Sequence, residues 1–311
     1  MALPIPFDAP VITTFISLLF CIKLTFPPEL KQNFRKQSSL MTISYICPAT
    51  GTMGKFQQYL PDFAKRLIKQ TAYRLYYFTE SVFIGSIDKY DPQTIAIFRN
   101  YLRPDANCID IGAHYGHILR EMLKSAPRGK HFAFEPIPHL YAALSKKFGR
   151  QVRVFNYALS DTKGTATFNL FVDKPALSGL QKRTDYGEQA VENFTVQTER
   201  LDDIIPRDIK IDLIKIDVEG AELIVLKGAR ELLKRDKPIV LFEFGKGSGS
   251  AYSTNPEELF DLFEHCDMEV SVIEYFLKQQ KGFSREEFCG QYEKGYNYFF
   301  IAYPAQLIPS I

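Results

Sequence analysis

The stretch CIDIGAHYG, residues 108–116, decides the fold of this chain. It begins as an apolar run that contains Asp110 and then carries two glycines four positions apart, Gly112 and Gly116. Apolar residues at helical spacing follow from Ile118 to Leu123. A strand, a tight turn and a helix start in this order predict the first βα corner of a nucleotide-binding sheet. Glycine admits a ligand close to the backbone because it has no Cβ, and the helix start offers free N–H groups.

The glycine spacing indicates which nucleotide suits this corner. A dinucleotide fingerprint is G-x-G-x-x-G, whereas this chain has D-x-G-x-x-x-G and lacks the middle glycine that admits a pyrophosphate. Asp110 would repel a diphosphate, but it would attract a cationic group such as the ammonium of a methionine. Glu135 follows Gly116 by 19 residues and ends the strand-like run 131–134, where an acid suits the hydroxyls of a ribose. These features favour S-adenosylmethionine over NAD, and a turn that binds no ligand is the alternative.

Composition excludes several classes of protein. With 311 residues, 46% of them hydrophobic, the chain can build one large domain or two modest ones. The net charge is +2 and the signs are interspersed, so we expect no nucleic-acid partner. The 5 cysteines are odd in number and show neither CxxC nor zinc spacing, which indicates reduced thiols in a cytoplasmic protein. No pattern specifies an oligomeric state.

The amino-terminal part is unusual because residues 11–26 are strongly apolar but interrupted by Lys23. A membrane span needs about 20 apolar residues, so this run is too short. Asp8 precedes the run and no basic residue does, which is unlike a secretory signal. We expect residues 1–55 to form an apolar segment and linker that is packed or poorly ordered. Contact with a membrane surface through residues 11–26 is the alternative, which would make the protein membrane-associated.

The rest of the chain predicts an α/β protein. Residues 56–104 are aromatic-rich with helical spacing, and we expect them to cover the domain edge with helices, the last at 94–102. Residues 105–305 alternate between strand and helix patterns, which predicts a doubly wound, mostly parallel seven-stranded sheet. We place strands at 107–111, 131–135, 152–156, 212–217, 239–244, 269–274 and 296–302, and helices near 116–125, 138–148, 221–235 and 256–265. An extra strand at 164–172 and a polar insertion at 173–195, a candidate substrate flap, depart from this alternation.

Carboxylates end four of these strands. Ligands bind beyond the carboxyl ends of strands in an open α/β sheet, and Asp110, Glu135, Asp217 and Glu243 stand there. Acids buried together require partners such as ligand hydroxyls, an ammonium group or backbone N–H groups.

The chain resembles the FkbM-type methyltransferases, a class I S-adenosylmethionine-dependent family with a Rossmann-like fold, over about residues 85–305. Six motifs carry the resemblance: CIDIGAHYG (108–116), FAFEPIP (132–138), YALSD (157–161), TERLDDII (198–205), DLIKIDVEGAELIVLKGA (212–229) and LFEF (241–244). The resemblance implies methyl transfer, usually to oxygen on sugars, polyketides or related metabolites. The family usually has Asn where this chain has His114.

The resemblance also assigns positions around the cofactor. The methionine part and the sugar would be framed by Asp110 and by the turn residues Gly112, Ala113, His114 and Gly116. Glu135 would take the ribose hydroxyls, and the adenine would be bordered by Ala158, Leu159 and Asp161. The sulfonium methyl group would lie beside Asp217 and Glu219.

Asp217 and Glu219 are the candidate catalytic residues. They are two positions apart, so on an extended segment they face the same side. Aligning an acceptor can supply about 7–11 kcal/mol, and a placed base adds on the order of 10²–10⁴-fold. The alternative for this pair is to cap the helix that follows, and for His114 it is a structural hydrogen bond. With Glu222 and Glu243 the pair offers oxygen ligands to Mg²⁺, but we expect no required metal because no histidine accompanies them.

O-methylation of a hydroxyl on a small molecule, sugar or glycan is the leading hypothesis. An NAD-dependent oxidoreductase is an alternative that the missing glycine disfavours. A nucleic-acid base methyltransferase would show Asn/Asp-Pro-Pro-aromatic where this chain has Asp217-Val-Glu-Gly. A binding module that keeps the fold without turnover is the non-catalytic alternative.

Overall fold

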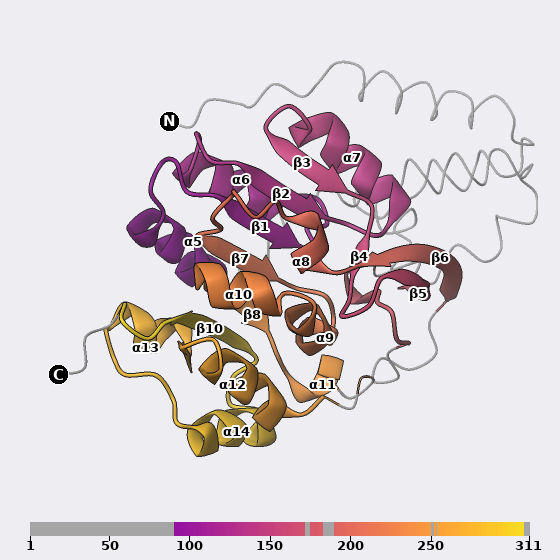
Figure 1. Cartoon of the computed structure of the whole chain (residues 1–311). Helices are drawn as coiled ribbons and strands as arrows, with labels where there is room; N and C mark the ends of the chain where they lie inside the picture. The colour runs from indigo at the N-terminus through magenta and orange to yellow at the C-terminus, as the bar shows by residue number, and fades with distance from the viewer. Residues whose placement is uncertain (1–89, 172–174, 183–189, 250–251, 253, 308–311) are drawn as a thin grey trace, which may run out of the picture. The chain divides into compact units, whose positions relative to one another are not determined.

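The computed structural model describes residues 90–171, 175–182, 190–249, 252 and 254–307 (Figure 1). The chain divides into two compact units, Met1–Gly85 and Ser86–Ile311, and the first lies outside the described residues. The predictions for residues 1–55, for the apolar run 11–26 and for most of 56–104 therefore stay predictions. Among the described residues, no helix has the length and apolar character needed to cross a bilayer.

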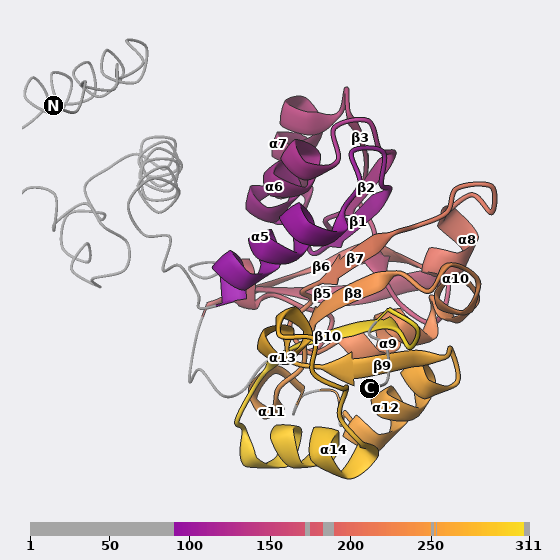
Figure 2. The same cartoon turned by 90° about the vertical axis from the view of Figure 1, so that its left-hand side faces the viewer.

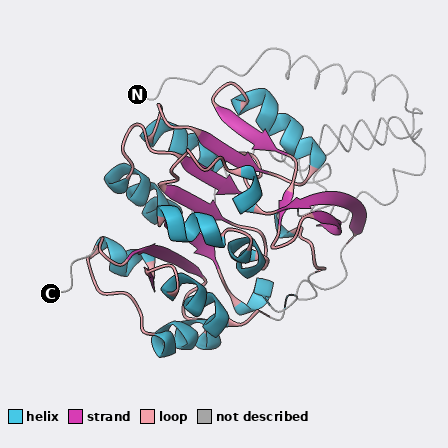
Figure 3. Ribbon diagram, in the orientation of Figure 1, coloured by secondary structure: helices cyan, strands magenta, loops and turns pink. Residues whose placement is uncertain are grey.

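A seven-stranded sheet forms the centre of the second unit, in the order β3-β2-β1-β7-β8-β10-β9. The strands are drawn in magenta in Figure 3. The strands are β1 (Cys108–Ile111), β2 (His131–Phe134), β3 (Val152–Phe155), β7 (Leu213–Ile216), β8 (Ile239–Glu243), β9 (Met268–Ser271) and β10 (Phe299–Pro304). The neighbours among β3, β2, β1, β7 and β8 pair in parallel, and β10 pairs antiparallel with β8 and β9. The prediction of a mostly parallel seven-stranded sheet is confirmed. The strand order reverses between β1 and β7, which is the switch point where such sheets bind ligands.

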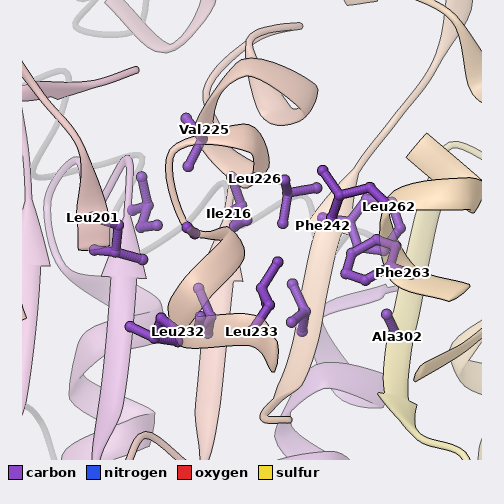
Figure 4. Close-up of a cluster of buried hydrophobic side chains, with 14 of the residues drawn as sticks. Leu201, Ile216, Val225, Leu226, Leu232, Leu233, Phe242, Leu262, Phe263 and Ala302 are labelled. Atoms are coloured by element: carbon purple, nitrogen blue, oxygen red, sulfur yellow. The ribbon is translucent and has the colours of Figure 1, made fainter. Parts of the chain in front are cut away.

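Helices cover both faces of this sheet (Figure 2). Side chains of α5 (Tyr90–Tyr101), α6 (His117–Ser125), α7 (Pro138–Phe148) and α13 (Ile273–Leu277) share one buried cluster with the sheet. Side chains of α8 (Leu201–Ile204), α9 (Glu222–Lys227), α10 (Arg230–Asp236), α12 (Pro256–Glu264) and α14 (Arg285–Lys294) share another (Figure 4). Strands β1, β2 and β7 are buried at every position, as expected for parallel strands between two helical layers.

Capping residues fix where two of these helices begin. The Asn255 side chain accepts the backbone N–H groups of Glu257 and Glu258 at the start of α12. Ser284 and Glu287 form a reciprocal capping box at the start of α14. Both arrangements satisfy N–H groups that have no partner inside the helix. Helix α14 was absent from the sequence prediction although Ser284 and Glu287 carry its start signal.

The predicted helix 221–235 is wrong as a single element, because α9 and α10 are separated at Gly228. The Gly228 carbonyl accepts the backbone N–H of Asp202, and the Asp202 carboxylate accepts the N–H groups of Glu231 and Leu232 at the start of α10. The predicted strand 269–274 also extends too far. Strand β9 ends at Ser271, and α13 begins at Ile273.

A second sheet lies in the region where we predicted an insertion. Its strands β4 (Ala158–Leu159), β6 (Val191–Glu199) and β5 (Gly164–Phe171) occur in the order β4-β6-β5. The extra strand predicted at 164–172 is therefore confirmed as β5. The flap predicted at 173–195 is wrong for its last part, because residues 191–195 belong to β6 and pair antiparallel with β5. Of the remainder, residues 175–182 dock on β5, where Asn169 and Gly179 exchange backbone hydrogen bonds, and 172–174 and 183–189 lie outside the described residues.

The turn after β1 depends on glycine because protein atoms occupy the space of a side chain. Gly112 has a φ of +78°, and a Cβ there would lie 1.8 Å from the carbonyl oxygen of Asp217. Gly116 has a φ of +72°, and its Cβ would lie 2.5 Å from the ring of Phe148. The turn is fixed further by the N–H groups of Gly112 and Ala113, which both donate to the carbonyl of Phe134. Gly112 thus allows the ends of β1 and β7 to lie in close contact.

We predict that Gly112→Ala lowers the free energy of unfolding by about 1–3 kcal/mol from backbone strain alone. The clash with the Asp217 carbonyl adds to this loss because neither backbone segment can move without disturbing the sheet. Urea unfolding measures the change. Gly290→Ala is the matched control, since nothing lies within 4 Å of a Cβ at that helical position. Equal stability of Gly112→Ala and the unmodified protein would contradict this account of the turn.

Candidate active site

Asp110 is a buried acid without a hydrogen-bond partner. The residue is 1% exposed, and neither carboxylate oxygen has a hydrogen bond of good geometry, although the backbone N–H of Leu119 acts on the carboxylate. Burial raises the pKa of Asp110 to about 6, with Lys215 opposing the shift and Asp217 adding to it. A native fold rarely leaves a buried polar group unsatisfied, so these oxygens indicate a ligand or solvent contact.

Glu135 holds the turn and the start of α7 together. One oxygen accepts the backbone N–H of His114 and the other that of Ile137, each at 2.9 Å. Burial raises the pKa of Glu135 to about 7, against these two hydrogen bonds. The Asn156 side chain donates to the carbonyls of Glu135 and Pro136 and so fixes the end of β2. A carboxylate has about four lone-pair sites, so Glu135 retains capacity for ligand hydroxyls.

His114 occupies the left-handed region of the backbone, with a φ of +48°. Among residues other than glycine, Asn, Asp and His are enriched in this conformation, which explains how His replaces the usual Asn of the family. Burial lowers the pKa of His114 to about 4, so the ring is neutral at physiological pH, and its Nε2 has no hydrogen-bond partner. The conformation accounts for the position, and the side chain remains chemically available as a hydrogen-bonding group.

Lys215 and Asp217 form an ion pair at the end of β7. The Lys215 Nζ lies 2.8 Å from Asp217 Oδ2, and the two side chains are 8% and 37% exposed. Lys215 is also the cross-strand partner of Asp110 in the β1–β7 pair. The chain itself therefore supplies an ammonium group as a partner for the buried acids. Sequence reasoning missed Lys215, although its position two residues before Asp217 on a strand was a readable signal.

Glu219 and Glu243 complete a carboxylate cluster with Asp217. One oxygen from each of these residues lies within 4.8 Å of the other two. Burial raises the pKa of Glu243 to about 9, with further contributions from Asp217, Glu219 and Glu222. The predicted pair Asp217 and Glu219 is thus close together. Glu219 has a φ of +57°, which differs from the extended backbone that we assumed for it.

Glu222 is a structural acid of the turn that precedes α9. Its Oε1 accepts the N–H groups of Val218 and Gly220, while Oε2 has no partner. Burial raises the pKa of Glu222 to about 7. The N-cap residue of α9 is Ala221, and it forms no side-chain capping hydrogen bond, so the N-cap position that we considered for Asp217 and Glu219 belongs to neither of them.

The residues predicted near the adenine, Ala158, Leu159 and Asp161, do not share one environment. Ala158 and Leu159 are 6% and 3% exposed and pack in two separate hydrophobic clusters. Asp161 lines a hollow of about 490 Å³ together with Asn169, Gln181, Tyr252 and other residues. That Ala158 and Leu159 border the adenine stays a prediction. Because their side chains are buried, they would contact the adenine through backbone atoms.

Tyr252 lines the same hollow, and sequence reasoning missed it. Its hydroxyl accepts the backbone N–H of Gln181 at 2.9 Å. A Cβ at Gly179 would lie 3.1 Å from the Tyr252 hydroxyl and 3.9 Å from the Glu219 carbonyl. The negative charges of Glu222 and Glu219 act on the Tyr252 hydroxyl and, with burial as the main cause, raise its pKa to about 12. No sequence pattern signalled this residue.

A family model for the FkbM methyltransferase domain matches residues 110–275, more than half of the chain. The chain belongs to the FkbM methyltransferase family. The match begins at Asp110 and includes the β1 turn, the end of β2 and the whole Lys215–Glu222 segment. The resemblance inferred from the motifs is confirmed.

Individual relatives of this FkbM-family protein cover parts of it. The chain is 30% identical over 209 residues to the AMB antimetabolite synthetase AmbE of Pseudomonas aeruginosa, covering 55% of this chain and 10% of the relative. It is 32% identical over 150 residues to the 2-O-methyltransferase NoeI of Sinorhizobium fredii, covering 43% of this chain and 62% of the relative. The crystal structure of an FkbM methyltransferase from Methylobacillus flagellatus has a TM-score of 0.41, with 17% identity, 68% of this chain and 48% of that chain covered. The chain thus spans less than two thirds of each of these relatives.

We predict that Glu222→Gln changes how stability depends on pH. Between pH 4.5 and about 7 the folded protein keeps the Glu222 proton that the unfolded chain has lost, so this group makes the free energy of unfolding fall as pH rises. Glutamine has no such proton but can still accept the Val218 and Gly220 N–H groups. From pH 4 to pH 8, the free energy of unfolding of the variant therefore rises relative to that of the unmodified protein, by on the order of 3 kcal/mol at most.

Urea unfolding at both pH values measures this difference. The control is Glu231→Gln, an exposed glutamate on α10. If Glu222→Gln and Glu231→Gln show the same change with pH, then Glu222 is not a buried acid of this kind.

Proposed function

We propose that this protein is an S-adenosylmethionine-dependent O-methyltransferase that acts on a hydroxyl of a small molecule, sugar or glycan. The observation that carries the proposal is the carboxylate cluster of Asp217, Glu219 and Glu243 beside the β1–β7 switch point. Membership of the FkbM methyltransferase family supports methyl transfer as the reaction class. One relative is named a 2-O-methyltransferase, which supports oxygen as the acceptor atom.

The residues at the β1 and β2 ends fit the cofactor. When bound, S-adenosylmethionine supplies an activated methyl group on a positively charged sulfur. Unpartnered Asp110 suits a cationic methionine part, and Glu135 has lone pairs left for two ribose hydroxyls. The turn Gly112–Gly116, with Ala113 and His114, would lie against the same ligand. Asp161 would contact the adenine from the loop after β4.

The β7 and β8 ends fit the acceptor. An alcohol becomes a better nucleophile when a carboxylate accepts its proton, and the Asp217 carboxylate is partly exposed and held by Lys215. Glu219, with a carboxylate oxygen within 4.8 Å of one of Asp217, would orient the same hydroxyl. The hollow that Asp161 and Tyr252 line also carries the hydrogen-bonding side chains of Thr167, Asn169 and Gln181. Such a lining suits an acceptor with several hydroxyl groups, because each hydroxyl can donate and accept a hydrogen bond.

The acceptor test uses S-adenosylmethionine with an isotopically labelled methyl group. The unmodified protein is incubated with a panel of sugars and oligosaccharides, of amines and of carboxylic acids, and mass spectrometry detects the labelled product. We expect label only on hydroxyl-bearing compounds, with at least a 10²-fold loss of rate in Asp217→Asn. Labelled amines would show an N-methyltransferase. Cofactor binding without transfer to any compound of the panel or of a cell extract would favour the non-catalytic binding module, and binding of NAD instead would favour an oxidoreductase.

We predict that Glu135→Gln weakens binding of S-adenosylmethionine about 10- to 100-fold. The amide oxygen can still accept one backbone N–H, but the variant loses charge-assisted hydrogen bonds worth about 1.5–3 kcal/mol. Titration calorimetry measures the dissociation constant. Glu192→Gln, at an exposed position of β6, is the matched control. Unchanged affinity in Glu135→Gln at unchanged thermal stability would exclude Glu135 from the cofactor site.

A further inference from the structure

Lys215 is an unusual residue for the middle of a parallel sheet. It lies in β7 between the flanking strands β1 and β8, and its side chain is only 8% exposed. Lysine is almost never buried without a partner, because its ammonium loses strong interactions with water. The contact of its Nζ with Asp217 Oδ2 at 2.8 Å supplies that partner.

Further acids surround the same ammonium. Asp110 is the cross-strand neighbour of Lys215, and Glu243 ends the adjacent strand β8. Burial alone would lower the pKa of Lys215, but the charges of Asp217, Asp110 and Glu243 outweigh burial and raise it. Lys215 is therefore a permanent cation among carboxylates.

A cluster of close carboxylates cannot ionise completely. Oxygens of Asp217, Glu219 and Glu243 lie within 4.8 Å of one another, and like charges at such distances push protons onto some of the groups. An ammonium in contact with one member stabilises the charge on that member. In this cluster the contact goes to Asp217, whose side chain is 37% exposed and can meet an acceptor. Glu243, at the end of β8, is half-buried and forms no such contact with the lysine within the described part of the chain, and burial together with the charges of Asp217 and Glu219 raises its pKa.

We propose that Lys215 is a positioning residue that makes Asp217 the anion of this cluster and fixes the direction of its carboxylate. The inference rests on the proposed transfer to a hydroxyl, in which an ionised carboxylate accepts the hydroxyl proton. That proton passes from the acceptor oxygen to Asp217 and on to solvent, and Lys215 keeps its own proton. Lys215 thus acts through Asp217 and needs no contact with either substrate.

The pH dependence of the cluster involves every element around it. The titratable groups that act on Lys215 or Asp217 are Asp110 of β1, His114 of the following turn, Glu135 after β2, Glu219 after β7, Glu222 of α9 and Glu243 of β8. All of these groups are retained in variants of Lys215 alone, so a difference between such variants reports the lysine.

The first test measures ionisation without any acceptor. Infrared spectra of the full chain distinguish protonated carboxyl groups from carboxylates across a pH titration. We expect Lys215→Met to show one more protonated carboxyl at neutral pH than the unmodified protein, and the double variant Lys215→Met/Asp217→Asn to lose that signal. Lys215→Arg keeps the charge and should titrate like the unmodified protein. Lys234→Met, which removes an exposed lysine of α10, is the control for net charge.

An unchanged titration of Lys215→Met would overturn the proposal. If Lys215→Met does not fold, the infrared titrations of Lys215→Arg and Asp217→Asn test the proposal in its place. The proposal then requires that Asp217→Asn remove one carboxylate that is ionised at neutral pH, and it fails if a protonated group disappears instead.

The second test uses an acceptor found in the labelled-methyl screen. Lys215→Met should lower kcat on the order of 10²-fold or more at neutral pH, with a much smaller change in the KM for S-adenosylmethionine. Activity should recover at higher pH, because a carboxyl group among like charges and without a cation ionises only there, and Lys215→Arg should restore much of the rate. Loss of rate without this pH shift would show a purely structural lysine.

The two proposals fail in different ways. If the protein methylates no hydroxyl, the proposed function fails while the infrared result still reports on Lys215. If EDTA abolishes hydroxyl methylation and Mg²⁺ restores it, the three carboxylates serve a metal ion, and the assignment of Asp217 as a lysine-held base is wrong.

Discussion

The close approach of the Asp217 carbonyl to Gly112 is the constraint on which the site depends. The two backbones meet where a side chain on residue 112 would begin, so the ends of β1 and β7 lie together at the point where the strand order reverses. The N–H of Asp217 also donates to the Ile111 carbonyl and fixes the same pair of strand ends. Through these contacts, the turn expected to hold the cofactor and the segment expected to hold the acceptor share one edge of the sheet.

Charge balance is the second constraint at this edge. Asp110, Glu135, Glu222 and Glu243 are acids whose pKa burial raises, whereas Lys215 is a buried cation in contact with Asp217. Backbone N–H groups donate hydrogen bonds to both carboxylate oxygens of Glu135 and to one of Glu222, whereas Asp110 has the charge of Lys215 nearby but no hydrogen-bond partner. The described acids at this edge outnumber the one buried cation that lies among them, and an excess of acids suits a positively charged ligand.

The prediction of elements succeeded where local pattern and tertiary structure agree. Continuous apolar runs such as Cys108–Ile111 and Leu213–Ile216 lie in the sheet, since both of their faces are covered by helices. The prediction failed at Gly228, where hydrogen bonds with Asp202 divide one helical pattern into α9 and α10. It failed also at residues 191–195, whose polar sequence is compatible with the half-exposed strand β6 once β5 lies beside it.

The sequence by itself determined the wound sheet, the positions of Asp110, Glu135 and Asp217 at strand ends, and membership of the FkbM family, because these follow from short motifs and from the period of apolar residues. Only the tertiary structure decided how each acid is satisfied. Lys215 meets Asp110 through pairing of strands more than a hundred residues apart, and Tyr252 meets Gln181 across 71 residues. Such contacts depend on the register and curvature of packed elements, which no local pattern encodes.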